Sequence, residues 1–245
     1  MTTRSRLERP AFYALRPGGW RDLVTLLHPP YTAWMLSYVA IGAATAPQLH
    51  TGRLLAALGA FFLAVGVGAH ALDELNGRPL ATRLSDRTLL VLAGVGLAGA
   101  VALGIAGAIT VSPGLTVFVV AGTFLVVTYS LELFGGRFHT DFWFAAAWGA
   151  FPALTGYWSN ALDLHVQGLL VAAACFMLSI AQRRLSTPAR ELRRRTAAVS
   201  GRQQLTDGTV VDLDAARLAA PLDGALAACA LALVLLAVGL VIARL

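Results

Sequence analysis

Long apolar segments alternate with short polar segments along most of this chain. An α-helix needs about 20 predominantly apolar residues to cross the hydrocarbon core of a bilayer, where the backbone must satisfy its own hydrogen bonds. The pattern therefore predicts an all-α, polytopic transmembrane bundle of about seven spans. These spans are expected at about Tyr31–Ala46, Leu54–Leu75, Thr88–Thr110, Pro113–Leu133, Thr140–Trp158, Val166–Ala181 and Gly224–Ala243.

The polar segments between the spans suggest how the chain is organised. We expect a single membrane domain over residues 1–245, with a polar N-terminal segment at 1–27 and a long polar loop at 182–223. Pro29-Pro30 is typical of a helix start, and Asp207-Gly208 indicates a turn inside the polar loop. The third span is rich in glycine, which favours close helix approach and predicts a place in the middle of the bundle.

Composition supports the membrane interpretation. Only 13% of the residues are charged and 57% are hydrophobic, whereas a soluble domain has roughly 25% charged residues. The net charge of +6 comes from arginines in the short segments between spans, where membrane topology explains them. We therefore expect membrane lipids, and no nucleic acid, as partners.

The arginines also predict an orientation. If the N-terminus lies inside, every arginine except Arg53 and Arg244 falls on the inner side, as the positive-inside rule requires. We expect an integral protein of a bacterial inner or plasma membrane, with the N-terminus and the motif-bearing loops in the cytoplasm.

The inner end of the second expected span carries three ionisable residues. His70, Asp73 and Glu74 are spaced i, i+3, i+4, which places them on one face of a helix. Ionisable groups at membrane depth are costly and are functional candidates by default. The alternative is an interfacial helix end that is solvated by water.

Two further inner segments could carry chemistry. Arg190, Arg194 and Arg195 follow the sixth expected span, and arginine forks match phosphate oxygens, so this cluster could hold a diphosphate. Attraction to anionic lipid headgroups is the alternative. The fourth and fifth spans supply Tyr129 and Trp148, whose rings could stabilise a cation.

These features together resemble the UbiA superfamily of intramembrane prenyltransferases. The resemblance covers about His28 to Gly201. It rests on the following matches: Pro29-Pro30 before the first span, Tyr129-Ser130 before an inner loop, Gly149 with Gly156-Tyr157 in the fifth span, and Arg194-Arg195-Thr196 before Gly201.

The chain departs from the family at both aspartate-rich motifs. If Asp73 is the middle aspartate of the first motif, Ala69 and His70 replace its Asn-Asp pair, and Gly77 replaces its last aspartate. In the second motif Leu185 and Ala189 stand at the aspartate positions, and Glu191 is the nearby carboxylate. The family usually has nine spans, two more than are expected here.

The resemblance implies transfer of an isoprenyl group from an isoprenyl diphosphate to a lipophilic acceptor. Mg²⁺ would be held by Asp73 and Glu74, and His70, Asp73, Glu74 and Tyr129 would form the catalytic set. Trp148, Tyr157 and Asn76 would line the pocket. Arg78, Arg83, Arg137, Arg190, Arg194 and Arg195 would bind the diphosphate.

Two other functions are compatible with the same residues. His70, Asp73 and Glu74 could serve as acid and base in a divergent isoprenoid or lipid lyase, isomerase or cyclase. The protein could also bind lipids without catalysis, because a fold does not determine a function.

Overall fold

The computed structural model describes residues 9–245, so Arg4 and Arg6 of the expected N-terminal segment lie outside the described residues. The described chain is predominantly helical, which confirms the all-α class. Its elements are α2 (Trp20–Leu26), α3 (Pro29–Thr45), α4 (Thr51–Phe61), η1 (Phe62–Ala69), α5 (His70–Leu75), α6 (Asp86–Thr110), α7 (Leu115–Ser130), α8 (Asp141–Ala145), η2 (Ala146–Ala150), α9 (Phe151–Ala161), α10 (Val166–Arg194), β1 (Gly201–Gln204), β2 (Val210–Leu213) and α11 (Ala215–Ile242).

Within residues 9–245, four helical segments are long and apolar enough to cross a membrane. They are Thr51–Leu75, Asp86–Thr110, Val166–Arg194 and Ala215–Ile242, and α7 is apolar but shorter. Length and composition thus support a membrane protein with several spans. Crossing by α3, by α7 and by the rod of α8, η2 and α9 stays a prediction, and so does a total of seven.

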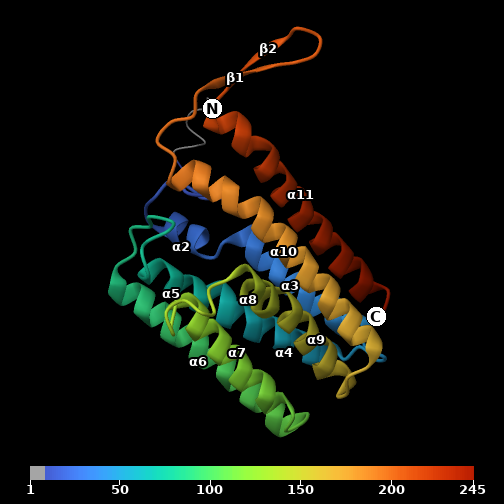
Figure 1. The fold of residues 1–245 in the computed structure, drawn as a ribbon. Helices are drawn as coiled ribbons and strands as arrows, with labels where there is room; N and C mark the ends of the chain where they lie inside the picture. Colours follow the sequence, from blue (N-terminus) through green and yellow to red (C-terminus); the bar gives the residue numbers. More distant parts are fainter. Residues whose placement is uncertain (1–8) are drawn as a thin grey trace.

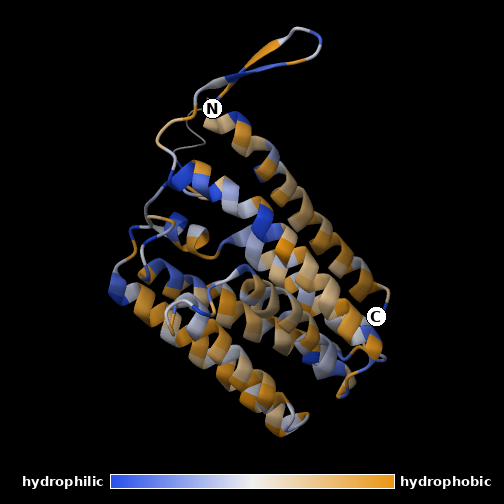
Figure 2. Ribbon diagram, in the orientation of Figure 1, coloured by the Kyte–Doolittle hydropathy of each residue, from blue (hydrophilic) through white to orange (hydrophobic). Residues whose placement is uncertain are grey.

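The polar segments gather at one end of the bundle. Figure 1 places α2 and the β-hairpin near this end and the C-terminus at the other, and Figure 2 shows apolar residues along α6, α7 and α11. At the C-terminal end, Arg244 donates to the carbonyl oxygens of Ala46 and Pro47, and Arg53 donates to those of Ser159 and Asn160. We call the opposite end, with α2 and α5, the arginine-rich end.

Helix α3 is the central helix of the fold. Trp34 and Tyr38 pack into one apolar cluster with residues of α9, α10 and α11. Met35 and Val39 pack into a second cluster with residues of α4, η1, α5 and α6. Because α3 is shared by both clusters, it joins the two halves of the bundle.

Glycines bring α3 and α9 into backbone contact. A Cβ added at Gly42 would overlap the carbonyl oxygen of Ala153, and one added at Gly156 would overlap that of Val39. Such an approach is possible only without side chains at these two positions.

The glycine-rich third span does not lie in the middle of the bundle, contrary to expectation. Only 17% of the apolar window of α6 is buried, and a Cβ at Gly94 would meet open space. Gly96 alone among its glycines lies close to the backbone of η1, where a Cβ would come within 2.6 Å of the Leu63 carbonyl oxygen. Most of this helix is therefore free to face lipid.

The expected polar loop at 182–223 is largely structured, which corrects that interpretation. Helix α10 continues to Arg194 because Gln182, Ser186 and Ala189 form a buried stripe at helical spacing. Strands β1 and β2 then pair in antiparallel register, from Gly201 opposite Leu213 to Gln204 opposite Val210.

The expected turn at Asp207-Gly208 connects these two strands. Gly208 has a φ of 86°, and the Asp207 side chain accepts a hydrogen bond from the Thr209 backbone N–H at 2.9 Å. The hairpin extends beyond the helices in Figure 1, and the chain then enters α11, whose N-cap is Asp214.

The close crossing of α3 and α9 predicts a strong effect of one methyl group. We expect Gly156→Ala to destabilise the protein by about 2 kcal/mol, because the added Cβ forces two backbones apart. Thermal unfolding of the purified protein in detergent measures this loss. Gly94→Ala is the matched control and should not destabilise; equal losses for both variants would contradict the packing argument.

Candidate functional site

The candidate site lies at the arginine-rich end, where α5, α7 and α10 meet. Asp73 on α5 is only partly exposed and lies against Ser130, the last residue of α7. Arg190 of α10 is close enough to act electrostatically on the Asp73 carboxyl group. Sequence spacing predicted both residues as site residues, and the fold brings them to one place.

The Glu74 carboxylate has a structural role instead of the expected catalytic one. Its side chain is fully buried, and Oε1 accepts hydrogen bonds from the Thr82 backbone N–H and hydroxyl at 2.8 and 2.9 Å. Oε2 accepts from the Leu80 backbone N–H at 2.9 Å. Glu74 thus holds the loop between α5 and α6, because buried N–H groups need acceptors.

The donor set does not fit the expected magnesium site. Mg²⁺ binds carboxylates together with substrate phosphates, but both oxygens of Glu74 are already used by the loop. Asp73 is the carboxylate that remains on this helix. Among residues 9–245 no group of three or more His, Cys, Asp or Glu side chains is arranged to hold a metal ion.

Two of the six expected diphosphate ligands act electrostatically on groups at this end: Arg190 acts on Asp73, and both Arg190 and Arg194 act on His28. Arg190 donates to the Ser186 carbonyl oxygen and the Thr187 hydroxyl, and the exposed Arg194 donates to the Pro10 carbonyl oxygen. Within the described chain, neither forms an ion pair with an acidic side chain. Their charges therefore remain available to an anion.

The other four arginines lie elsewhere. Arg78 forms an ion pair with Asp86 and donates to the Leu84 carbonyl oxygen at 2.6 Å, so it is held by its own loop. The expected ligands Arg83, Arg137 and Arg195 are exposed at the surface of this end. Sequence proximity to a motif grouped these arginines, and none of the four is among the groups that shift the pKa of Asp73.

His70 is buried beside a histidine that sequence analysis did not select. Its ring stacks on that of His28 with 4.0 Å between centroids and 13° between planes. His70 Nδ1 lies 3.2 Å from the Gly66 carbonyl oxygen. Gly66 belongs to η1, and π-helical turns of this kind are frequent at functional sites.

Tyr129 connects the polar residues to the apolar interior. It is buried, and its ring stacks on His139. It also contacts Phe144, and it meets Trp148 in an edge-to-face contact with centroids 5.4 Å apart. Asp73, Arg183 and Arg190 are the charged residues that act on its hydroxyl, together with Asp141. The structure thus brings Tyr129 and Trp148 into contact, and their role in stabilising a cation stays a prediction.

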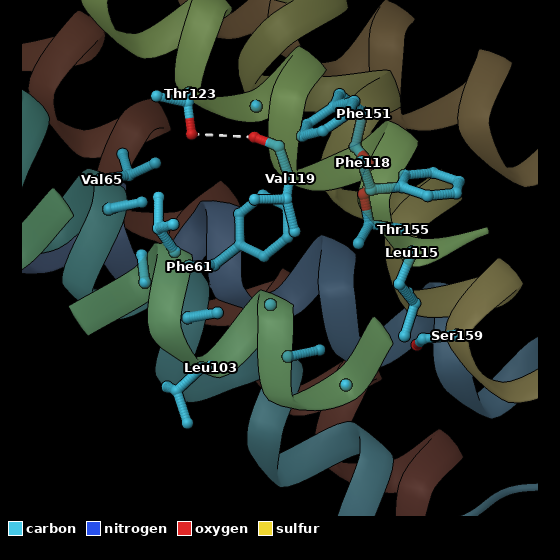
Figure 3. A pocket seen from close by; sticks show the side chains of 18 of the residues that line it. Phe61, Val65, Leu103, Leu115, Phe118, Val119, Thr123, Phe151, Thr155 and Ser159 are labelled. Carbon is cyan, nitrogen blue, oxygen red and sulfur yellow. Dashed lines mark hydrogen bonds between the residues drawn. The ribbon is translucent and has the colours of Figure 1, made fainter. Parts of the chain in front are cut away.

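Trp148 also lines an apolar cavity of about 140 Å³ between α4, α6, α7 and α9. Figure 3 shows side chains of Phe61, Leu115, Phe118 and Phe151 around this space. Leu115 and Val126 both line it, so it extends along twelve residues of α7, or roughly 16 Å. Its far end is polar, with Arg53 and Ser159.

The two remaining pocket predictions have different outcomes. Asn76 lies at the site, where its side-chain amide donates to the Ser130 carbonyl oxygen at 3.3 Å. Tyr157 lies at the opposite end of α9, and its hydroxyl bonds to His165 Nδ1 at 2.9 Å. Tyr157 is therefore not part of this site, because a helix separates residues 148 and 157 by about 13 Å.

Sequence analysis missed three aromatic residues near the site. Tyr13, His28 and Tyr31 form a cluster in which Tyr13 contacts both other rings. Arg190 and Arg194 act electrostatically on all three residues. The signal was the polar His28 directly before Pro29-Pro30, which was interpreted only as a helix start.

Comparisons of the chain with protein-family models, with curated proteins and with solved structures found no match. The resemblance to the UbiA superfamily therefore stays a prediction that rests on the motifs described above.

The separate roles of Asp73 and Glu74 are testable by stability alone. Glu74→Gln replaces one acceptor oxygen by an NH₂ group that faces a loop N–H, and we expect a loss of about 2 kcal/mol in the free energy of unfolding. Asp73→Asn is the control, since its side chain holds no loop amide, and should unfold at the wild-type temperature or above. Thermal unfolding in detergent compares them, and a stable Glu74→Gln variant would contradict the structural role.

Proposed function

We propose that the protein is an intramembrane prenyltransferase that transfers an isoprenyl group from an isoprenyl diphosphate to a lipophilic acceptor. One observation carries the proposal: a polar site with two arginines that form no ion pair among residues 9–245 is joined through Tyr129 and Trp148 to an elongated apolar cavity. An isoprenyl diphosphate has the same division into an anionic head and an apolar tail.

The arginines would bind the head group. Arg190 and Arg194 offer charge-assisted, bidentate hydrogen bonds to phosphate oxygens. They would also stabilise the charge that the diphosphate acquires as the C–O bond to the isoprenyl carbon breaks and the electron pair leaves with oxygen. This role does not depend on a second carboxylate, which Glu74 cannot supply.

The aromatic residues and Asp73 would act on the reacting carbon. The faces of Tyr129 and Trp148 favour positive charge developing on the isoprenyl group. The acceptor then forms the new bond to this carbon, and its displaced proton passes to the Asp73 carboxylate as general base. The cavity keeps the tail apart from water during this step.

A divergent lyase, isomerase or cyclase is the second candidate. The observation that favours it is Asp73, whose carboxyl group lies near Arg190 and two further carboxylates, Glu132 and Glu74, a setting suited to acid–base chemistry. Product analysis separates the two functions. A transferase releases diphosphate only when an acceptor is present, whereas the alternative changes an isoprenoid or lipid without one.

The first test is binding of geranylgeranyl diphosphate to the purified protein in detergent. We expect Arg190→Gln to weaken binding by at least about tenfold, since a hydrogen bond to a charged group is lost. Wild-type affinity should persist in EDTA because arginines carry the neutralisation. Arg87→Gln, an exposed position at the same end, is the matched control.

Two outcomes would contradict these expectations. Binding that disappears in EDTA would mean that a metal ion completes the site, and Arg190→Gln with unchanged affinity would remove the arginine from it. Absence of binding for geranylgeranyl diphosphate and for shorter and longer isoprenyl diphosphates would overturn the proposed function.

The second test concerns the tail. Ala60 of α4 lines the cavity, and Ala60→Phe should fill part of it and weaken geranylgeranyl diphosphate binding by about tenfold or more. Inorganic diphosphate has no tail, so its own affinity, measured by competition, should be unchanged. Val120→Phe adds the same ring on an exposed face of α7 and serves as control; equal effects of both variants would argue against a tail site.

A further inference from the structure

The proposed function leaves one buried polar pair at the site unexplained. Tyr13, from the segment before α2, places its hydroxyl 2.8 Å from Nδ1 of His28, the residue that precedes α3. His28 has a φ of 46° and an adjacent proline, so its backbone lies in the left-handed region that few residues adopt. The ring itself is held by the hydrogen bond with Tyr13 and by the stacked His70 ring.

The hydrogen bond determines which nitrogen of His28 carries hydrogen. Burial raises the pKa of Tyr13 and lowers the pKa of His28 well below its ordinary value of 6.5, an effect to which the His70 ring adds. Both side chains are therefore neutral near pH 7. The Tyr13 hydroxyl has this one hydrogen bond in the described chain, and the contact alone allows either partner to donate. If Nδ1–H donated, the buried Tyr13 O–H would be left without an acceptor, so the arrangement with fewer unpaired groups has Tyr13 donating to Nδ1 and the hydrogen on Nε2.

The Nε2–H group has no acceptor. The atom is buried, and among residues 9–245 no hydrogen-bond partner faces it. A buried donor without an acceptor costs about 1–3 kcal/mol, which a bound ligand with an acceptor oxygen would recover.

The surroundings of His28 indicate the charge of such a ligand. Arg190 and Arg194 both act electrostatically on the ring, and the parallel His70 ring covers one of its faces. No carboxylate acts on His28 among the groups that shift its pKa. A donor beside two cationic groups is suited to a phosphate oxygen.

We propose that His28 is a further ligand-binding residue of this site, whose Nε2–H donates to an oxygen of the bound diphosphate, and that Tyr13 holds the ring in the tautomer that permits it. The inference rests on the proposed function. Because Nε2 is buried, the ligand reaches it only when side chains around the ring move aside.

The test compares two Tyr–His pairs of the same chain. His28→Phe keeps a stacked ring without nitrogen and should weaken geranylgeranyl diphosphate binding by at least about tenfold. His28→Gln keeps an N–H near the Nε2 position and should recover most of the affinity. His165→Phe is the matched control, because Tyr157 bonds to His165 at the other end of the bundle, and it should bind as the wild type does.

A second measurement uses the wild-type protein and does not depend on folding of the variants. In ¹⁵N NMR of histidine-labelled protein, His28 should show a protonated Nε2 and an unprotonated Nδ1, and geranylgeranyl diphosphate should shift the Nε2 resonance. Competition experiments identify the source of the anion. Inorganic diphosphate should displace geranylgeranyl diphosphate. Displacement by phosphatidic acid alone would assign the donor to a lipid headgroup and overturn the inference.

Wild-type binding combined with an unchanged affinity of His28→Phe, or with an unmoved Nε2 resonance, would overturn the role of His28 and leave the proposed function standing. Failure of the wild type to bind any isoprenyl diphosphate would overturn both.

Discussion

Backbone contact between α3 and α9 is the constraint on which the rest of the bundle depends. Gly42 and Gly156 let two backbones meet where a methyl group would not fit, and in a bilayer such packing replaces the hydrophobic force that is missing between apolar helices. The contact aligns α3, with His28 at its start, against the rod that carries Trp148. It therefore sets the distance between His28 and Trp148.

The arginine-rich end also depends on the hydrogen bonds that Glu74 accepts. A carboxylate that accepts three hydrogen bonds from one loop is no longer available as a metal ligand or a base. Asp73, one residue earlier, points to Ser130 and Arg190 instead. Two adjacent acidic residues thus divide into one that stabilises the fold and one that belongs to the site.

The site joins arginines that form no ion pair among the described residues, aromatic rings and an apolar cavity through a continuous series of neighbouring residues. Arg190 acts on Asp73 and Tyr129, Tyr129 meets Trp148, and Trp148 lines the cavity. Both π-helical segments are adjacent to this series, since η1 precedes His70 and η2 contains Trp148. The local widening of these helices places side chains that a regular helix would direct elsewhere.

Much of this could be predicted from the sequence alone. Apolar length determines where helices form, and helical spacing puts Asp73 at the end of one helix and Arg190 at the end of another, so their place at the arginine-rich end follows from local pattern. Tertiary structure alone decided which polar groups satisfy one another. Glu74 is used by a loop, Arg78 by Asp86, and Tyr13 meets His28 across fifteen residues. Hydrogen bonds and ion pairs depend on positions in three dimensions to within a fraction of an ångström, and hydrophobic periodicity, which records only one face of one helix at a time, does not contain that information.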